Sequence, residues 1–220
     1  MPTAAVSFPH IGTDESGKGD YFGPLVAAAI LVDAAAAAEL TADGLRDSKQ
    51  LSDGRVRKLA GRVRGCCPVS VVAIGPEKYN DLYGRMRNLN RMLAWAHARA
   101  IENLLAQVDC PLVITDQFGD EAFVRSALME RGRKVELVQY PGAEADAAVA
   151  AASVVARDEF LKRLAALGEE IGLPLPKGAG PPVEEAALGV VRTHGPEALR
   201  RVAKLHFRTT ARILARAGRA

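Results

Sequence analysis

The longest apolar run of the sequence, residues 25–33 (LVAAAILVD), limits the possible folds most, because it has the length of a β-strand and ends in a charge. A helix needs about 20 apolar residues to cross a bilayer. We therefore expect no membrane-spanning segment. Four other segments have strand-like patterns and complete a set of five expected strands: 6–14, 68–75, 111–116 and 134–140.

Helix-like spacing occupies much of the remaining sequence. In residues 88–107 the apolar residues recur at intervals of three and four, from Leu89 and Leu93 to Leu104, which predicts an amphipathic helix. We expect further helices at 34–40, 52–64, 144–171, 196–206 and 209–217.

The order of these elements predicts a mixed α/β sheet, because three early strands are followed by helices that alternate with two more strands. One Pro/Gly cluster, at 75–84, interrupts the middle of the chain, and a second, at 174–182, predicts a loop before the C-terminal helices. A chain of 220 residues can bury one core and is marginal for two. We expect a core at 1–172 and a C-terminal helical extension at 173–220 that packs on it, in a single domain overall.

The composition is that of an ordinary globular protein, with 49% hydrophobic and 25% charged residues. The N-terminus lacks the basic and apolar regions of a signal peptide, so we expect a cytoplasmic protein. Cys66, Cys67 and Cys110 have no metal-ligand spacing, which favours free thiols in a reducing compartment. The net charge is only +3, but basic residues crowd three stretches and indicate a phosphate-bearing partner: 46–64, 85–99 and 192–219.

Acidic residues at the ends of the expected elements carry the functional prediction. Asp14 and Glu15 end the first strand, Asp116 ends the fourth, and Glu144, with Asp146 close behind, opens a long helix. Carboxylates at strand ends can converge on one edge of a sheet, where they repel and raise each other's pKa. Such a cluster is costly unless cations occupy it, and oxygen ligands select Mg²⁺ or Mn²⁺. Two such ions about 4 Å apart can hold the attacking and leaving oxygens of a phosphodiester displacement.

Each acidic residue also has a structural interpretation. An Asp at a strand end usually starts a turn or caps a helix. Glu144 would be favourable at the positive N-terminus of its helix whatever the function. Asp14 and Glu15 are adjacent and point to opposite faces of a regular strand, so we expect one of them to lie where the strand bends or ends.

A glycine-rich segment follows Glu15 directly, with the sequence SGKGDYFGP at residues 16–24. Its three glycines let the backbone approach a ligand closely, and exposed N–H groups can hold a phosphate or a sugar. The segment is not a Walker loop, because G-x-x-x-x-G-K-[ST] is absent. Tyr21 and Phe22 either pack under this loop or touch a base.

Residues 12–25, GTDESGKGDYFGPL, resemble the opening motif of the ribonuclease HII/HIII family. The lysine between the first two glycines is similar to the HIII branch, whereas HII typically has an arginine there. Further segments resemble the HIII branch in the same order: RDSKQLS, NLNRMLAWAHARAIENLL, VITDQF, EADAAVAAASVVAR, LPKGAG and KLHFRTT. Together the matches span residues 11–210.

This resemblance implies an RNase H-like fold, with a five-stranded mixed sheet flanked by helices. It also implies an active site built from carboxylates that bind metal ions. Asp14, Glu15 and Asp116 would be metal ligands, and Glu144 would be the fourth catalytic carboxylate, with Asp146 as the alternative. The resemblance also implies a set of substrate contacts: Ser16, Gly17, Lys18, Gly19 and Lys49.

Other residues near these motifs have open roles. Asp47 and Ser48 would hold the substrate backbone or their own loop, and Ser153 would pack near the site, where its role could be wholly structural. For a further set of basic residues, a phosphate contact and a solvated surface charge are both open: Arg157, Lys177, Lys204 and Arg208.

The activity implied by the resemblance is that of an endonuclease that hydrolyses the RNA strand of RNA/DNA hybrids. It would use Mg²⁺ or Mn²⁺, two ions during catalysis, leave 5′-phosphate and 3′-hydroxyl ends, and act in DNA replication and repair. Contacts to the 2′-hydroxyl would select RNA. We expect a monomer. Ribonuclease HIII usually carries an N-terminal substrate-binding domain, but only about ten residues precede the first motif here, so the chain resembles the catalytic domain alone.

Three rival interpretations remain. Ribonuclease HII-like incision at single ribonucleotides embedded in duplex DNA uses a C-terminal tyrosine, and no tyrosine follows Tyr140. A non-catalytic hybrid-binding module would not need all four carboxylates. A DNA nuclease or recombinase of the same fold is possible, because one fold hosts many functions, but the glycine–lysine–glycine loop argues for RNA.

The four histidines lie on separate elements without ligand spacing, which argues against a shared Zn²⁺ site: His10, His97, His194 and His206.

Overall fold

A computed structural model describes residues 8–117 and 121–218 of the chain. In that part, five strands form one sheet: β1 (His10–Ser16), β2 (Leu25–Val32), β3 (Val69–Ile74), β4 (Leu112–Asp116) and β5 (Glu136–Tyr140). Each lies within one of the segments predicted from the sequence or extends it by two residues. The expected start of the first strand, at residue 6, lies outside the described residues.

Helices connect and follow the strands. The first half of the chain forms α1 (Ala34–Ala42), α2 (Asp53–Cys66), α3 (Pro76–Met86) and α4 (Leu89–Leu105). The second half forms α5 (Glu121–Ala127), α6 (Ala147–Ile171), α7 (Pro181–His194), α8 (Leu199–Val202) and α9 (Arg208–Ala217). Short 3-10 helices include η1 (Ser48–Gln50) and η3 (Ala143–Ala145). Within the described residues, none of these helices combines the length and the apolar character needed to cross a membrane.

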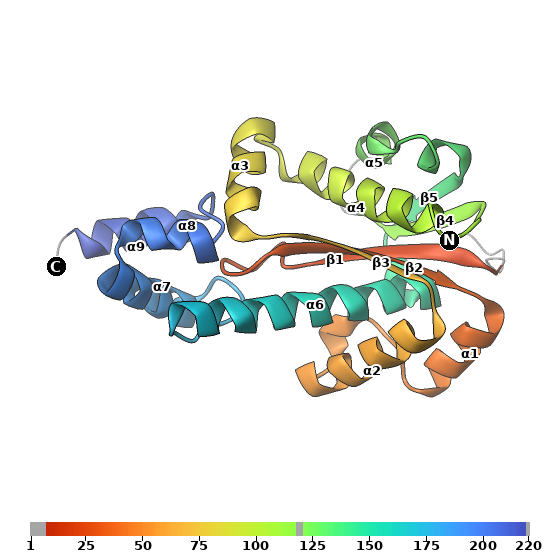
Figure 1. Cartoon of the computed structure of the whole chain (residues 1–220), viewed down its shortest axis with the longest axis horizontal. Helices are drawn as coiled ribbons and strands as arrows, with labels where there is room; N and C mark the ends of the chain where they lie inside the picture. Colours follow the sequence, from red (N-terminus) through yellow and green to blue (C-terminus); the bar gives the residue numbers. More distant parts are fainter. Residues whose placement is uncertain (1–7, 118–120, 219–220) are drawn as a thin grey trace. The chain divides into compact units, whose positions relative to one another are not determined.

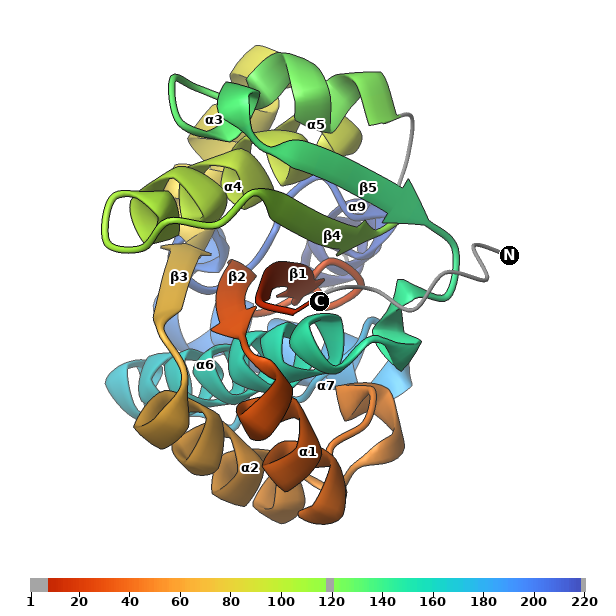
Figure 2. The same cartoon turned by 90° about the vertical axis from the view of Figure 1, so that its right-hand side faces the viewer.

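The strand order in the sheet is β3-β2-β1-β4-β5 (Figure 2). β4 runs parallel to both of its neighbours, with Thr13 of β1 opposite Thr115 and Asp116 opposite Tyr140 of β5. Only residues 17–24 connect β1 with the adjacent β2, which is too short for a parallel crossover, so these two strands are antiparallel. The predicted five-stranded mixed sheet is therefore confirmed.

Helices cover both faces of this sheet. Figure 2 shows α4 and α5 on one face, and α1, α2 and the first half of α6 on the other. The α4 face buries an apolar cluster that includes Ile11 of β1, Ile101 of α4 and Val113 of β4. On the other face, Gly12 of β1 lets α6 approach the sheet closely, because a Cβ atom there would lie only 2.1 Å from the carbonyl carbon of Ala148.

The chain divides into two compact units by its contacts. Unit 1 comprises Met1–Glu15, Ala27–Val72 and Leu93–Asp158, and unit 2 comprises Ser16–Val26, Ala73–Met92 and Glu159–Ala220. Unit 1 thus contains β4, β5, α1, α2 and α5, and unit 2 contains α3 and α7–α9. A C-terminal extension at 173–220 that packs on a core at 1–172 stays a prediction.

Within unit 2, α3 packs on α8, and α7 packs on α9 (Figure 1). The amide of Asn80 in α3 donates to the carbonyl oxygen of Ala203 at 2.9 Å, and its side-chain oxygen accepts the N–H of Leu205 at 2.9 Å. These two bonds attach the segment that follows α8 to α3.

Two segments differ from their sequence-based prediction. The Pro/Gly cluster at 75–84, which is expected to interrupt the chain, forms α3, because Pro76 occupies the start of the helix, where a missing N–H costs nothing. The helix expected from residue 144 begins at Ala147, because Asp146 accepts the N–H groups of Ala148 and Val149 and so caps α6.

Candidate active site

The carboxylates predicted to form the site come from three neighbouring segments of unit 1. Asp14 and Glu15 lie near the end of β1, Asp116 ends the adjacent β4, and Glu144 lies in η3, after β5. The pairing of Thr13 with Thr115 places Asp14 and Asp116 side by side at the same edge of the sheet. The N–H of Ala143 donates to the Asp116 carboxylate at 3.3 Å, which holds η3 at this edge.

Asp14 faces α6. It is only 8% exposed, and its carboxylate accepts the backbone N–H of Glu15 at 2.8 Å. Burial, and then the negative charge of Glu15, raise the pKa of Asp14 to about 7, although hydrogen bonds from the Ser153 hydroxyl and the Glu15 N–H oppose the shift. Asp14 therefore occupies a setting in which a compensating positive charge would be strongly favourable.

Glu15 points to the opposite face of β1, towards α4. The Nε2 atom of His97 lies 3.1 Å from a Glu15 carboxylate oxygen, and its Nδ1 atom lies 2.9 Å from the hydroxyl of Thr13. His97 is 1% exposed. Both ring nitrogens of His97 are therefore used in polar contacts, one to each of these side chains.

This contact of His97 is not predicted from the sequence. A usable signal was nevertheless present, because His97 lies four residues after Leu93 and three before Ala100, and therefore on the buried face of α4. A buried histidine needs a polar partner. The identity of that partner, Glu15, could not be read from helical spacing.

Asp116 and Glu144 form the second half of the acidic group. Burial, followed by the charge of Glu144, raises the pKa of Asp116, and the charge of Glu15 adds a smaller contribution. Hydrogen bonds from the backbone N–H groups of Gln117 and Ala143 oppose this shift. The charges of Glu144 and Glu15 thus act on Asp116, although these residues are spread over about 130 positions of the sequence.

The charges of the same carboxylates act on Lys49. Burial lowers the pKa of its ammonium group, but negative charges outweigh this effect and raise it, in descending order those of Asp47, Asp14, Asp116 and Glu144. The loop that carries Lys49 is held by α6: the Ser48 and Ser153 hydroxyls lie 2.8 Å apart, and Arg157 donates to the carbonyl oxygen of Ser48 and to Asp53. Arg157 therefore holds the loop, and Ser153 bonds to it directly.

Asp146 and Glu144 have different surroundings. Besides capping α6, Asp146 accepts a hydrogen bond from the Nε2 atom of His10 at 2.9 Å, so its oxygens are committed to the fold. Glu144 instead lines a cavity of about 360 Å³, together with Arg46 and Asp47.

The donor set suits a hard divalent cation, because it consists of carboxylate oxygens. Burial, and then the charge of a neighbouring carboxylate, raise the pKa of two of its members, Asp14 and Asp116. Among the described residues, no three His, Cys, Asp or Glu side chains are placed together as a ready ligand group. The opposite orientations of Asp14 and Glu15 on β1 account for part of this spread.

The glycine-rich loop belongs to unit 2. Gly17 has a φ of +87°, and a Cβ atom there would lie 2.2 Å from the carbonyl oxygen of Pro24, so only glycine fits. At Gly19 an added Cβ would meet no described atom within 4 Å, so the fold itself does not require a glycine there. Tyr21 and Phe22 are fully buried, and the ring of Tyr21 packs against that of Phe207, which excludes contact with a base.

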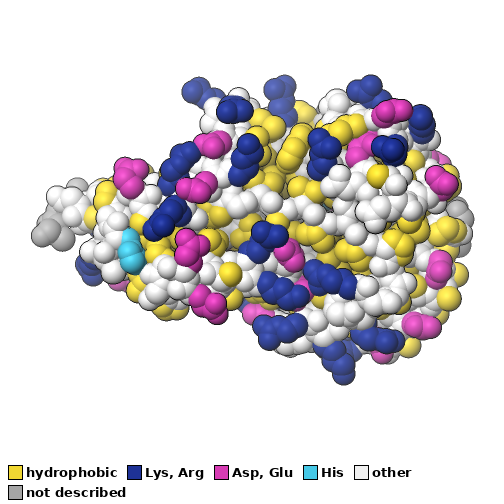
Figure 3. Space-filling view, viewed as in Figure 1, with side chains coloured by type: hydrophobic (Ala, Val, Ile, Leu, Met, Phe, Trp, Pro, Cys, Tyr) yellow, Lys and Arg dark blue, Asp and Glu magenta, His cyan; other side chains and the backbone are white. Residues whose placement is uncertain are grey.

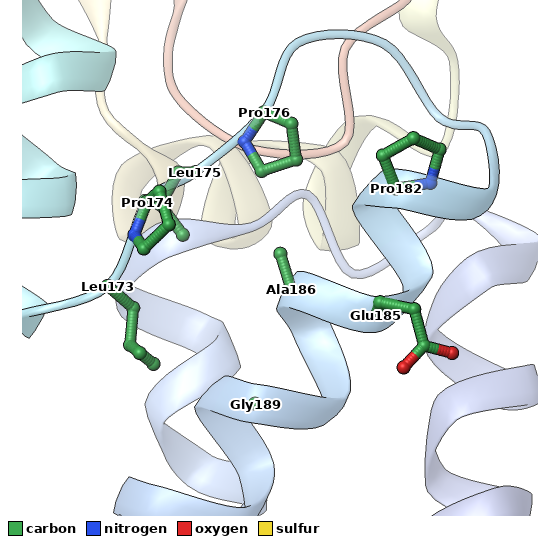
Figure 4. Close-up of a pocket in the computed structure, with 8 residues that line it drawn as sticks. All are labelled: Leu173, Pro174, Leu175, Pro176, Pro182, Glu185, Ala186 and Gly189. Carbon is green, nitrogen blue, oxygen red and sulfur yellow. The ribbon is translucent and has the colours of Figure 1, made fainter.

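A pocket of about 490 Å³ lies elsewhere in unit 2, between residues 173–176 and α7 (Figure 4). Its lining is mostly apolar and includes Leu173, Leu175 and Ala186, with Glu185 at its edge. None of the predicted site residues lines this pocket.

The family model described as Ribonuclease HII matches residues 11–210 of the chain. The chain belongs to the ribonuclease HII family. As a member of the ribonuclease HII family it is a ribonuclease H, an endonuclease. This confirms the enzyme class and the family that the sequence motifs indicate.

Curated relatives within the ribonuclease HII family carry the name Ribonuclease HIII. The protein from Protochlamydia amoebophila (strain UWE25) is 46% identical over 99% of this chain and 73% of its own length. The protein from Chlamydia pneumoniae is 42% identical over 91% of this chain and 68% of its own length.

Solved structures of similar proteins confirm the predicted RNase H-like fold. A crystal structure of Bst-RNase HIII in complex with Mn²⁺ has a TM-score of 0.90 and 37% identity, and the match covers 97% of this chain and 71% of that one. Ribonuclease H2 from Pyrococcus horikoshii OT3 has a TM-score of 0.79 at 21% identity over 97% of this chain and 100% of that one, a likeness of fold alone.

Proposed function

We propose that the chain hydrolyses the RNA strand of RNA/DNA hybrids, with two divalent cations, Mg²⁺ or Mn²⁺, bound by Asp14, Glu15 and Asp116 and with Glu144 as the fourth catalytic carboxylate. The observation that carries this proposal is the placement of Asp14 and Asp116 side by side on β1 and β4, with raised pKa values at both carboxylates and the charge of Glu144 acting on Asp116. Such a group is costly to the fold unless cations offset its charge.

When bound, the ions would activate the attacking water and stabilise the leaving 3′-oxygen, so that the products carry 5′-phosphate and 3′-hydroxyl ends. The protein's own task is to hold ligands and substrate in place. β1 and β4 fix the backbone of Asp14 and Asp116 side by side, and His97 holds one oxygen of Glu15. Lys49, beside these carboxylates, is well placed for a phosphate of the substrate.

The substrate contacts in this proposal are Ser16, Gly17, Lys18, Gly19 and Lys49. The open side of Gly19 leaves room for a ligand to approach the backbone. Contacts from the loop to the 2′-hydroxyl would select RNA over DNA. Asp146 caps α6 and accepts a hydrogen bond from His10, which favours Glu144 as the fourth carboxylate.

The HIII type of activity on long hybrids is favoured over HII-like incision at single ribonucleotides. Lys18 stands between two glycines, no tyrosine follows Tyr140, and the named relatives are ribonucleases HIII. Cleavage-site mapping on duplexes with increasing numbers of ribonucleotides separates the two: efficient incision at a single embedded ribonucleotide would favour the HII type.

We further propose a monomeric protein that acts in the cytoplasm, in DNA replication and repair.

The ligand role is tested with the variant Asp116→Asn, assayed on a hybrid with Mg²⁺. We expect cleavage to fall by at least about 100-fold, because a neutral amide is a much poorer ligand for a hard cation. Asp109→Asn, which removes an exposed aspartate just before β4, serves as the matched control and should cleave normally. Normal cleavage by Asp116→Asn would refute the assignment.

A further inference from the structure

Lys204 is completely buried, which excludes the phosphate contact and the solvated charge considered for it from the sequence. It follows α8 in unit 2. Its ammonium group donates to the carbonyl oxygen of Asp20 at 2.8 Å and to that of Phe22 at 3.3 Å. Its backbone N–H donates to the carbonyl oxygen of Tyr21 at 2.8 Å. A single residue therefore satisfies three consecutive carbonyl groups of the glycine-rich loop.

The burial of this lysine is costly to the fold. In the described part of the chain no carboxylate lies within ion-pair distance of its ammonium group, which sits 5.6 Å from the ring centre of Tyr79. Burial lowers the pKa of Lys204 to about 7, and the charge of Asp20 opposes this shift only in part. An apolar residue of similar length would avoid that cost but would leave the carbonyl oxygens of Asp20 and Phe22 without this donor. The ammonium group is therefore expected to serve the conformation of the loop.

The same loop residues have further backbone anchors in unit 2. The N–H of Tyr21 donates to the carbonyl oxygen of Gly178 at 2.8 Å, and the N–H of Gly178 donates to the Asp20 carboxylate at 2.6 Å. The N–H of Gly23 donates to the carbonyl oxygen of Val202 at 2.9 Å. The half of the loop from residue 20 to 23 is thus fixed, and it directly follows Gly17, Lys18 and Gly19.

We propose that Lys204 is a positioning residue for substrate binding, which sets the backbone conformation of residues 17–22 and thereby the affinity of the enzyme for the hybrid. The inference rests on the proposed function, in which Gly17, Lys18 and Gly19 contact the substrate. Lys204 acts through the loop and does not touch the substrate itself. A loop already held in its binding conformation loses less entropy when the substrate binds.

The test is the variant Lys204→Met, which removes the ammonium group and keeps both the backbone N–H and most of the buried volume. We expect the KM for a hybrid to rise about tenfold, because the loop must be ordered on binding, while kcat changes by less than about twofold. Mn²⁺ affinity, measured by calorimetry without substrate, should be unchanged. Amide hydrogen exchange in residues 17–22 should become faster by at least about tenfold.

A matched control separates positioning from general loss of stability. Val190→Ala removes buried methyl groups from α7 in the same unit and should lower the melting temperature with no change in KM. If Lys204→Met does not fold, Lys204→Gln replaces it, because the shorter amide cannot reach both carbonyl groups and should still accelerate exchange in the loop. Wild-type KM together with unchanged loop exchange in the folded variant overturns the inference.

A second variant distinguishes failure of this inference from failure of the proposed function. Lys18→Ala removes a proposed substrate contact directly. If Lys18→Ala raises the KM and Lys204→Met does not, the substrate role of the loop stands and the positioning role of Lys204 is wrong. If the wild-type enzyme does not cleave the hybrid, or if neither variant changes the KM, the proposed role of the loop fails and the inference fails with it.

Discussion

Asp14 makes the folded protein sensitive to pH in the absence of metal. Burial and the charge of Glu15 raise its pKa from 3.8 to about 7. Between about pH 4 and pH 7 the folded chain therefore binds more protons at this site than the unfolded chain, so the contribution of Asp14 to the free energy of unfolding falls as the pH rises. Above pH 7 that loss is complete.

The variant Asp14→Asn should remove this pH-dependent decrease in the free energy of unfolding. In metal-free buffer at pH 8 we expect its free energy of unfolding to exceed that of the wild type by on the order of 1–3 kcal/mol, with little difference at pH 4. Urea unfolding at the two pH values measures both quantities. An equal gain at pH 4 would show that packing, and not the charge of Asp14, is responsible.

His97 fixes one oxygen of Glu15, a proposed metal ligand, and such outer partners commonly change metal affinity by 10–100-fold. In His97→Asn the shorter amide can still reach Thr13 but not Glu15, so we expect Mn²⁺ to bind about tenfold more weakly. His97→Gln places an amide nitrogen near the position of Nε2 and should bind nearly as the wild type does.

The control for this prediction is a second buried histidine–carboxylate pair of unit 1. His10 bonds to Asp146, which caps α6 and is not a proposed ligand. His10→Asn should therefore leave Mn²⁺ affinity, measured by calorimetry, unchanged. Equal loss of affinity in His10→Asn and His97→Asn would contradict a specific role for His97.

Helices differ in how far their basic residues are neutralised. The sequence concentrates arginines after residue 192, but Arg212 and Arg216 of α9 form ion pairs with Glu184 and Glu185 of α7. Figure 3 shows basic and acidic side chains interspersed where these helices lie in Figure 1. In contrast, the arginines around the α3–α4 junction are exposed and have no carboxylate partner among the described residues: Arg85, Arg87 and Arg91.

The α3–α4 junction should therefore contribute more to binding of a polyanion than α9 does. In the non-cleaving Asp116→Asn background, we expect the triple variant with Gln at positions 85, 87 and 91 to bind a hybrid more weakly. The slope of log Kd against log salt concentration should fall by about 2–3, roughly one for each phosphate that no longer has a cationic partner.

A control with the same change in net charge isolates the effect of position. The triple variant with Gln in place of the ion-paired Arg163, Arg212 and Arg216 loses three positive charges from the same unit. Its salt dependence should remain close to that of the wild type. Equal slopes for both triple variants would show that net charge, and not the junction, governs binding.

At the scale of the whole molecule, the two compact units are not contiguous in sequence. Residues 16–26 and 73–92 group with the C-terminal segment from residue 159 onwards, while the sheet edge with the carboxylates belongs to the other unit. The composition of the chain indicates only two Pro/Gly interruptions, at 75–84 and at 174–182. A boundary that depends on distant segments packing together leaves no local signal, because composition and spacing report only on neighbouring residues.

The sequence by itself determined the five strands, the long helices, the carboxylates at the strand ends and the family, because alternation, helical spacing and short motifs are local properties. It also limited the candidates for the fourth catalytic carboxylate to two residues, Glu144 and Asp146. Only the tertiary structure assigned Asp146 to His10 and the α6 cap, His97 to Glu15, and Lys204 to the loop. The partners in these three interactions lie 136, 82 and 184 positions apart, and which distant groups meet is decided by the packing of the whole chain.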